Sequence, residues 1–380
     1  MQTTSTITNT DLLIVGQGLV GQALANQLKD LPMTITLIDQ KSHTLTNTDP
    51  RILALNPNSI DLLYGHHQPK QAYAIKQVHL HTVPGYPADS LTSKANTQLG
   101  SCIPLVAIEQ HLLAQLKSHN INWINGATFL DITSNENAHL VRFTKNKKIH
   151  EVKAKLVIGA DGCHSPVASS IPTNDAQSTL PTMHSNLWPV TLQKTYSHQA
   201  WFGIMQHAFI AYIPLQDKRG KLIVTTLTAL ASPSSWLENQ KKHLVNFPEF
   251  GLQNHFHYTS ETFCRQSKQN GILLLGQAAS CLPPIGAQQL NSALIQVQYV
   301  THQIKSMLEQ SKPLNQLDPQ QNHLSTLATY HSLIKVIQYG LTYQQLPHRL
   351  KKLGHWAIPA PIRQQVTDYL RGWGQGAYRA

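Results

Sequence analysis

Charged residues are scarce in this chain. Of its 380 residues only 13% are Asp, Glu, Lys or Arg, about half the usual share. The 30 Lys and Arg residues outnumber the 19 Asp and Glu residues, which gives a formal net charge of +11 at pH 7. A basic protein can attract nucleic acid, an anionic membrane surface or a phosphorylated cofactor. No basic and aromatic module of the nucleic-acid-binding type is visible, so we expect no nucleic-acid partner.

Cysteine is also rare, and long apolar runs are missing. The four cysteines lie far apart without a Cys-x-x-Cys pair, which favours reduced thiols in a cytoplasmic protein. The first ten residues carry no Lys or Arg, unlike the start of a secretory signal. No stretch of about 18 apolar residues occurs, so no transmembrane helix is expected. The 21 histidines show no recognisable ligand spacing, so no metal site is predicted.

The first functional signature is a glycine turn between two apolar runs. Residues 11–15 lead into Gly16-x-Gly18-x-x-Gly21, and a second apolar run over 34–38 ends in Asp39. This order predicts a strand, a helix and a second strand with a dinucleotide-binding turn. Here Gly16 makes the tight turn, Gly18 lets the backbone approach a pyrophosphate, and Gly21 lets the helix pack on the strand. The expected contacts are Gly16, Gly18, Leu19, Val20, Gly21, Asp39 for a ribose, and Gln40.

Two later stretches repeat this logic. The apolar run 156–159 ends near Asp161, which is placed to touch a ligand or to form a simple Asp-Gly turn. The run 272–275 ends at Gly276, and two prolines precede a helix whose apolar spacing begins at Leu290. Such a junction aims backbone N–H groups and the positive end of a helix dipole at an anionic or electron-rich ligand.

The remaining chain alternates helical and strand patterns. We expect a helix from Asp49 and Arg51 through Leu63, a helix over 104–118, and strands over 127–155 with a turn at 146–147. Residues 181–262 read as β-rich, with a hairpin around 217–220 and a capping box, Ser235-x-x-Glu238, opening a helix. The stretch 345–380 has six basic residues against one acid, which suits an anionic membrane surface and a solvated cap equally.

Three ordered motifs together resemble one family. They are Gly16-x-Gly18-x-x-Gly21, then Gly159-Ala160-Asp161-Gly162-x-x-Ser165, then Gly276-Gln277-Ala278-Ala279 followed by Pro283-Pro284-Ile285-Gly286-Ala287 and Asn291. The combination resembles the single-component FAD-dependent aromatic hydroxylases, and within them the polyprenylphenol hydroxylases of ubiquinone biosynthesis. The Asp49-x-Arg51 stretch and residues 346–354 fit the same branch.

The resemblance implies an extended FAD and ring hydroxylation. NAD(P)H would reduce the flavin, O₂ would add to it, and the flavin hydroperoxide would pass one oxygen to a phenol, so the cofactor carries the difficult chemistry. The implied residues at the reaction centre are Pro283, Pro284 and Gly286. Beyond the first turn, the implied cofactor contacts are Arg51, Asp161, Gly276, Gln277, Gln289 and Asn291. Other quinone-biosynthesis proteins are the implied partners.

Four positions depart from the family pattern around this one cofactor. Gln277 replaces the usual Asp, Ser280 the usual His, Gln289 a Gly, and Ala168 an Arg. Two hypotheses therefore stay open, an active monooxygenase with an altered flavin loop and a non-catalytic accessory relative. A third is another flavoprotein, such as a dehydrogenase or a halogenase, because fold does not fix function. The Trp-x-Trp-x-x-Pro signature usual in halogenases is missing.

The predicted fold class is α/β, a Rossmann-like FAD-binding domain with an inserted β-rich substrate domain and a helical C-terminal tail. The FAD-binding domain is expected to comprise residues 1–75, 97–180 and 263–325. The substrate domain is assigned 76–96 and 181–262, and the basic tail 326–380. We expect a cytoplasmic protein and leave open a peripheral attachment to the inner face of the membrane.

Overall fold

The computed structural model describes most of the chain up to residue 319. The described residues are 7–41, 51–65, 67, 69–81, 89–92, 98–117, 119, 121–177, 182–205, 208–216, 218–241, 249–252 and 256–319. The predicted basic tail lies outside them. Within the described ranges, no helix is long and apolar enough to cross a membrane.

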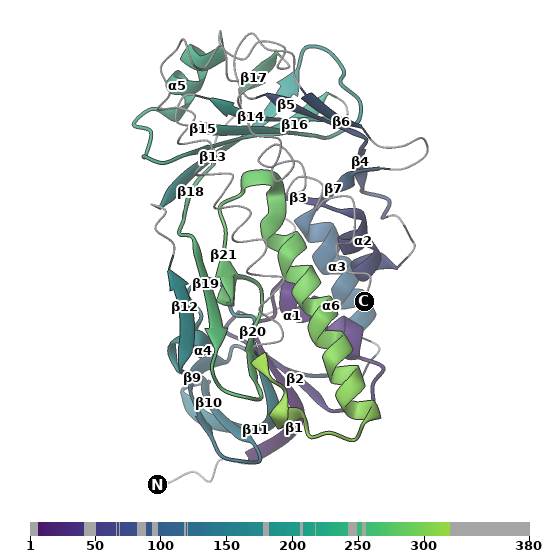
Figure 1. The fold of residues 1–380 in the computed structure, drawn as a ribbon, viewed down its shortest axis with the longest axis vertical. Coiled ribbons are helices and arrows are strands. Elements are labelled where there is room, and N and C mark those ends of the chain that lie inside the picture. Colours follow the sequence, from purple (N-terminus) through teal and green to yellow (C-terminus); the bar gives the residue numbers. More distant parts are fainter. Residues whose placement is uncertain are drawn as a thin grey trace.

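A seven-stranded sheet forms the lower end of the molecule in Figure 1. Its strands are β1 Ile7–Val15, β2 Ile35–Asp39, β8 Ile121–Asn125, β9 Thr128–Ser134, β10 His139–Lys145, β11 Lys148–Gly159 and β20 Ile272–Leu274. The order is β8-β2-β1-β11-β10-β9, and β20 pairs with β11. The pairs β8/β2, β2/β1, β1/β11 and β11/β20 are parallel, while β9 to β11 form an antiparallel meander.

Helices bury one face of this sheet. The described helices are α1 Leu19–Leu28, α2 Pro57–Tyr64, α3 Leu105–Leu116, α4 Pro166–Ser169, α5 Pro233–Gln240 and α6 Gln288–Glu309, with short 3₁₀ turns η2 Gly276–Ala278, η3 Ile285–Ala287 and η4 Leu314–Gln316. Leu12 and Ile14 of β1 pack into the cluster formed with α1, α3 and α6. Leu13 and Val15 face the opposite cluster with Val167 of α4. Strand β1 is therefore apolar on both faces, as a buried parallel strand should be.

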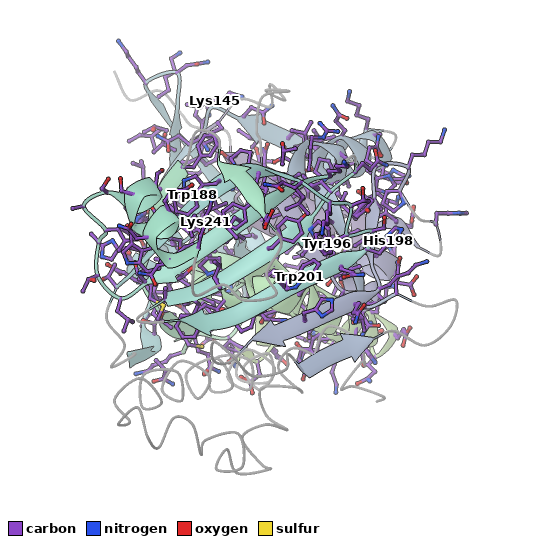
Figure 2. The ribbon with its side chains drawn as sticks, turned by 90° about the horizontal axis from the view of Figure 1, so that it is seen from above. Lys145, Trp188, Tyr196, His198, Trp201 and Lys241 are labelled. Carbon is purple, nitrogen blue, oxygen red and sulfur yellow. The ribbon has the colours of Figure 1, made fainter. Side chains whose placement is uncertain are left out.

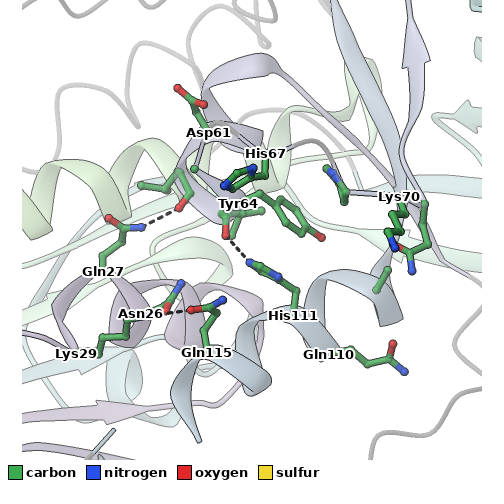
Figure 3. Close-up of a pocket in the computed structure, with 16 residues that line it drawn as sticks. Asn26, Gln27, Lys29, Asp61, Tyr64, His67, Lys70, Gln110, His111 and Gln115 are labelled. Atoms are coloured by element: carbon green, nitrogen blue, oxygen red, sulfur yellow. Dashed lines mark hydrogen bonds between the residues drawn. The ribbon is translucent and has the colours of Figure 1, made fainter. Parts of the chain in front are cut away.

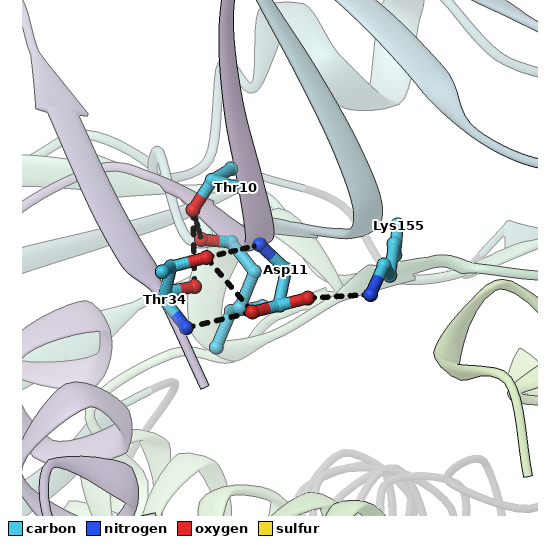
Figure 4. A network of polar contacts seen from close by, with 5 residues as sticks. Thr10, Asp11, Thr34 and Lys155 are labelled. Atoms are coloured by element: carbon cyan, nitrogen blue, oxygen red, sulfur yellow. Dashed lines mark hydrogen bonds and ion pairs between the residues drawn. The ribbon is translucent and has the colours of Figure 1, made fainter. Parts of the chain in front are cut away.

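A polar network joins the central strands beside the point where β2 begins (Figure 4). Asp11 accepts hydrogen bonds from the backbone N–H and the hydroxyl of Thr34, both at 2.8 Å, and pairs with Lys155 Nζ at 2.7 Å. Burial alone would raise the pKa of Asp11, but the contacts with Lys155 and Thr34 outweigh it and lower the pKa below its ordinary value. The ionised carboxylate therefore stabilises the register of β1 between β2 and β11.

An eight-stranded sheet forms the upper end of the molecule in Figure 1. Its strands are β5 Gln77–His81, β6 Asp89–Thr92, β13 Met183–Leu192, β14 Gln199–Met205, β15 Ala208–Pro214, β16 Arg219–Thr226, β17 Phe250–Leu252 and β18 Phe256–Ser260. The order is β17-β13-β16-β15-β14-β5-β6, with β18 also paired to β13. On the outer face, Trp188 and Trp201 pack with Leu237 of α5, and Tyr196 meets Trp201 edge-on at 5.1 Å (Figure 2).

Two small sheets connect the large ones. One has the order β3-β7-β4, with β3 Ile52–Leu55, β7 Gly100–Pro104 and β4 Tyr73–Ile75, and the other β12-β19-β21, with β12 Thr173–Gln177, β19 Phe263–Ser267 and β21 Ser280–Cys281. Ala54 and Cys102 of the first small sheet pack against Ile223 on the inner face of the eight-stranded sheet. Ala287 of η3 joins the same cluster. The inner face of the upper sheet therefore lies directly on the loop before α6.

The predicted α/β class with a Rossmann-like unit is confirmed, but two local predictions are wrong. The residues after Arg51 form β3, not a helix, because they pair with β7. The helix starts only at Pro57, where the Asn56 side chain caps it. Helix α5 begins at Pro233, so Ser235 lies inside it and forms no capping box. The turn at 146–147 and the hairpin of β15 and β16 are confirmed. The domain boundaries stay a prediction.

Candidate functional site

The first glycine turn is built from two packed glycines and one open one. Gly16 has φ +106, and a Cβ there would lie 2.3 Å from the Ala160 carbonyl oxygen. At Gly21 a Cβ would lie 2.0 Å from the Gly16 carbonyl oxygen. At Gly18, the N-cap of α1, an added Cβ would meet nothing within 4 Å, and no side chain caps the helix. Backbone N–H groups of the first helical turn therefore meet open space in front of Gly18.

Asp39 is held by the same turn. Its Oδ2 accepts the backbone N–H of Gln17 at 2.7 Å, and its Oδ1 accepts that of Lys41 at 2.7 Å. Each oxygen keeps a second lone pair, so the half-buried carboxylate can still accept a hydroxyl. Gln40 beside it is exposed. The backbone thus fixes the acid at the end of β2, where the sequence predicts a ribose contact.

The structure brings the three predicted motifs together. Gly16 lies against the backbone of Ala160 and Asp161, and Val20 of α1 lies against Gly276, where an added Cβ would be 3.0 Å from its side chain. Leu19 and Val20 are half-buried in the first turn of α1. The glycine turns after β1, β11 and β20 therefore meet at the carboxyl ends of parallel strands, the usual ligand edge of such a sheet.

The Asp161 carboxylate is occupied by its own loop. Its Oδ1 accepts the Ser165 hydroxyl at 2.6 Å, and its Oδ2 accepts the Val167 N–H at 3.1 Å. Burial raises the pKa of Asp161, and the nearby Asp39 charge raises it further. The hydrogen bonds from Ser165 and Val167 lower the pKa and partly offset this rise. The carboxylate orders the start of α4, where Ala168 is buried in the core. A ligand contact by Asp161 stays a prediction.

The loop before α6 takes left-handed backbone at two positions. Gly286 has φ 65 and Ala287, the N-cap of α6, has φ 53. No side chain caps this 22-residue helix, so its first N–H groups and its positive dipole end are available to a ligand. Pro283 is buried and Pro284 half-buried in the approach to this turn. Both prolines and Gly286 therefore shape the loop predicted to face a flavin.

Side-chain amides brace this loop. Gln289 Oε1 accepts the Leu282 N–H at 2.6 Å, and its Nε2 donates to the Ser280 carbonyl at 2.9 Å. Gln296 Oε1 accepts the Gly276 N–H at 2.8 Å. In contrast, Gln277 is exposed and forms no hydrogen bond with other described residues. Gln289 therefore turns toward the loop, and Gln277 is available to a ligand.

Asn291 connects the loop to the strand that follows Arg51. It is fully buried, and its Oδ1 accepts the Asn56 N–H at 3.0 Å. Its Nδ2 donates to the carbonyls of Ala54 and Ala287 at 3.0 and 2.9 Å. Asn291 thus fixes η3 against β3, and its contact with a cofactor stays a prediction. Arg51 itself is exposed at the start of β3.

Sequence reasoning missed Asn56 and Gln296 as supports of this site. Both are polar residues with an exposed fraction of 2% or less. The sequence held one signal for Gln296, an amide at a helical position where the spacing calls for an apolar residue. Gln296 lies between Leu294 and Val297 on the buried part of α6. A buried amide needs hydrogen-bond partners, so its position predicts a backbone contact but not which one.

A separate groove opens between α1, α2 and α3 (Figure 3). Its volume is about 840 Å³, and Tyr64, His111 and Lys29 are among its lining residues. The rings of Tyr64 and His111 lie 4.3 Å apart, and the His111 Nε2 contacts the Leu63 carbonyl at 3.0 Å. Burial lowers the pKa of His111. None of the predicted site residues lines this groove, so it is distinct from the edge where the motifs meet.

Comparisons with known proteins agree with this geometry. A sequence model of the family described as FAD binding domain matches residues 9–320. No curated protein sequence matches the chain. The structure is similar to p-nitrophenol 4-monooxygenase from Pseudomonas putida DLL-E4, with a TM-score of 0.76 and 13% identity over 97% of this chain and 100% of that one.

Two further solved structures have the same fold. A geranylgeranyl bacteriochlorophyll reductase-like protein from Thermoplasma acidophilum has a TM-score of 0.67 and 14% identity, covering 96% of this chain and 100% of that one. Aklavinone-11 hydroxylase in complex with FAD and aklavinone has a TM-score of 0.60 and 17% identity, covering 80% and 63%.

Proposed function

Because this chain belongs to the FAD binding domain family, we propose that it is an FAD-dependent monooxygenase that hydroxylates an aromatic ring. The proposed substrate is a polyprenylphenol intermediate of ubiquinone biosynthesis, with NAD(P)H as reductant and O₂ as oxygen donor. Two of the similar structures are named as a monooxygenase and a hydroxylase, and one of these holds FAD. Their names support the reaction class, and the ubiquinone branch rests on the motifs of this sequence.

The open turn at Gly18 carries the proposal. An uncapped helix N-terminus with no Cβ in front of it fits a pyrophosphate, which accepts backbone N–H groups and favours the positive dipole end. Asp39 retains lone pairs for a ribose hydroxyl. The exposed Gln277 amide can accept from, and donate to, hydroxyls of the sugar-alcohol chain. These residues fit FAD along the edge where the three motifs meet.

The chain's own residues would position the reaction. When bound, FAD supplies the redox chemistry with NAD(P)H and O₂. The N-terminus of α6 has no side-chain cap, so its backbone N–H groups point toward an electron-rich group of a ligand bound beside the loop. Leu187, Ala211 and Ile223 of the upper sheet are part of the apolar cluster with Ala287 and exclude water above the loop. Asn291 fixes the loop to β3.

Reconstitution with FAD tests this function directly. The wild-type protein should acquire flavin absorbance at about 450 nm, oxidise NADPH faster when a phenol is added, and yield a hydroxylated product detected by mass spectrometry. Gly18→Val should abolish FAD binding, because its side chain would occupy the space in front of α1. Wild-type protein that stays colourless and does not oxidise NADPH would contradict the proposal.

A second candidate function is an accessory role in a quinone-biosynthesis assembly without catalysis. Gln289 favours it, because a long side chain stands where the family has Gly and is used to brace the loop. Complementation separates the candidates. Wild-type chain that restores ring hydroxylation in a strain lacking the hydroxylase, with loss of rescue in Gly18→Val, supports catalysis. Failure of the wild-type chain to restore it supports the accessory role.

Attachment to an anionic membrane through the basic tail is a further proposal, and 326–380 lies outside the described residues. The six basic residues of 345–380 support it. Full-length protein should float with vesicles containing phosphatidylserine and detach at high salt. Equal flotation with neutral vesicles would contradict an electrostatic attachment.

A further inference from the structure

A buried glutamine lies directly behind the open glycine turn. Gln22 is 2% exposed and stands beside Ala23 and Leu24 among the buried residues of α1. Its Nε2 donates a hydrogen bond to the Gln17 carbonyl at 2.7 Å, while its Oε1 is buried without a partner among the described residues. A buried oxygen without a donor costs stability. Such a departure from the rule for a buried helical position is expected at functional sites.

Gln22 binds two successive carbonyl groups of the turn. Its side chain donates to the Gln17 carbonyl, and its backbone N–H donates to the Gly18 carbonyl at 3.0 Å. The bond to Gly18 is the first of the helical series, because the N-cap carbonyl accepts it. The bond to Gln17 extends this series by one carbonyl, with the side-chain amide in place of a backbone N–H. Both carbonyls therefore point toward Gln22.

Peptide geometry then determines where the N–H groups point. A peptide unit is planar and trans, so its N–H points in the direction opposite to its carbonyl. Because the Gln17 carbonyl points toward the buried Gln22 side chain, the Gly18 N–H points away from it, on the side where Gly18 is exposed. The Leu19 N–H follows from the Gly18 carbonyl in the same way. Neither N–H has an acceptor among the described residues.

The preceding N–H group is already used. The Gln17 N–H donates to Asp39 Oδ2 at 2.7 Å, so the donors of the turn that are available to a ligand begin at Gly18. A phosphate group at a helix N-terminus accepts several backbone N–H groups at once. Gln22 thus orients one donor, the Gly18 N–H, in addition to those that the first turn of α1 supplies.

We propose that Gln22 is a positioning residue for the pyrophosphate of the cofactor, which holds the Gln17 carbonyl so that the Gly18 N–H points toward a phosphate oxygen. The inference rests on the proposed function, which assigns FAD to this turn. The packing of Gly16 and Gly21 gives the turn its shape, and Gln22 fixes the direction of one peptide within it. The affinity for phosphate therefore depends on a side chain that does not touch the ligand.

A comparison of ADP with adenosine tests the proposal. The two probes share the adenine and the ribose expected at Asp39, and ADP alone carries a pyrophosphate. Their affinities are measured by calorimetry on the full chain after removal of any bound flavin, and FAD affinity by a fluorescence titration. Wild-type protein should bind ADP at least about 10-fold more tightly than adenosine, because only ADP accepts the N–H groups of the turn.

Two substitutions of Gln22 remove the contact with the Gln17 carbonyl. Gln22→Met keeps a similar length without a donor, and Gln22→Asn keeps an amide that is one methylene too short. Each should weaken the binding of ADP and of FAD by about 3- to 10-fold, the worth of one neutral hydrogen bond. The affinity for adenosine should stay at the wild-type value, because Asp39 is held by the backbone N–H groups of Gln17 and Lys41.

Gln27→Met is the matched control. Gln27 lies in the same helix and also donates its amide to a backbone carbonyl, that of Leu62 at 2.7 Å, but near the opposite end of α1. Urea unfolding should show at least as large a loss of stability in Gln27→Met as in Gln22→Met, since only the latter also removes an unsatisfied buried oxygen. The control should keep the wild-type ratio of ADP to adenosine affinity.

Three results would overturn the inference. They are folded Gln22 variants that keep the full ADP preference, an equal loss of adenosine and ADP affinity in these variants, which indicates a merely structural role, and wild-type protein that binds ADP no more tightly than adenosine. Failure of the proposed function is a different result. In that case the wild type prefers ADP as expected but does not oxidise NADPH after reconstitution with FAD.

Discussion

The N-termini of α1 and α6 both face the edge where the motifs meet, and they are built differently. The α1 turn is shaped by backbone packing, with Gly16 and Gly21 in contact and Gly18 open. The α6 loop is shaped by side-chain amides, chiefly Gln289 and Asn291. Backbone packing admits glycine alone and keeps a sequence pattern strict. Amide bracing allows other residues, and three of the four departures from the resemblance (Gln277, Ser280 and Gln289) lie between β20 and α6.

The α1 turn can be broken most severely at Gly21. Gly21→Ala places a Cβ 2.0 Å from the Gly16 carbonyl oxygen, and two backbone segments must separate to admit it. We expect the free energy of unfolding, measured in urea, to fall by about 3 kcal/mol. Gly18→Ala is the control and should cost less than about 1 kcal/mol, because its Cβ meets nothing and only the capping preference changes. Equal losses in both variants would contradict the division between packed and open glycines.

The α6 loop should respond to loss of its brace. Gln289→Ala leaves the Leu282 N–H and the Ser280 carbonyl without this partner, so we expect about 2 kcal/mol lower stability and about 10-fold weaker FAD binding in a fluorescence titration. Gln298→Ala, an exposed position on the same helix, should change neither. Tighter FAD binding in Gln289→Ala would show instead that the side chain crowds the flavin.

A charge introduced at Gln277 tests whether this position contacts the cofactor. It is exposed and unbonded among the described residues, so Gln277→Asp should leave stability within about 0.5 kcal/mol. A carboxylate accepts stronger hydrogen bonds than an amide, and FAD affinity should rise about 3- to 10-fold. Gln277→Ala serves as the reference and should weaken binding. Unchanged affinity in both variants would remove Gln277 from the cofactor site.

The same difference explains what the sequence could predict. The α1 turn depends on neighbouring residues, so the spacing of Gly16, Gly18 and Gly21 was enough to predict its strand, helix and terminal Asp39. The partners of Gln289 and Asn291 depend on how distant segments meet, which no local pattern records. The helix expected after Arg51 is wrong for the same reason. Residues 52–55 pair with the distant strand β7, and this pairing overrides their local preference.

The smallest effect on FAD affinity is expected at Asp11, which joins the middle of β1 to β2 and β11, along the strand from the α1 turn. Asp11→Asn keeps the shape but removes the charge that accepts from Thr34 and pairs with Lys155. Lys155 is 60% exposed, so solvent screens the pair and the loss at pH 7 should be about 1 kcal/mol.

The pKa of Asp11 is lowered in the folded chain, so its stabilisation is present above the unfolded pKa of about 4 and disappears as the pH falls through the folded value. Urea unfolding of wild type and Asp11→Asn should therefore differ at pH 7 and converge toward pH 3. FAD affinity should stay equal in both proteins, because the α1 turn depends on its own glycine packing. A loss of affinity in Asp11→Asn would show that the turn also depends on the register of β1.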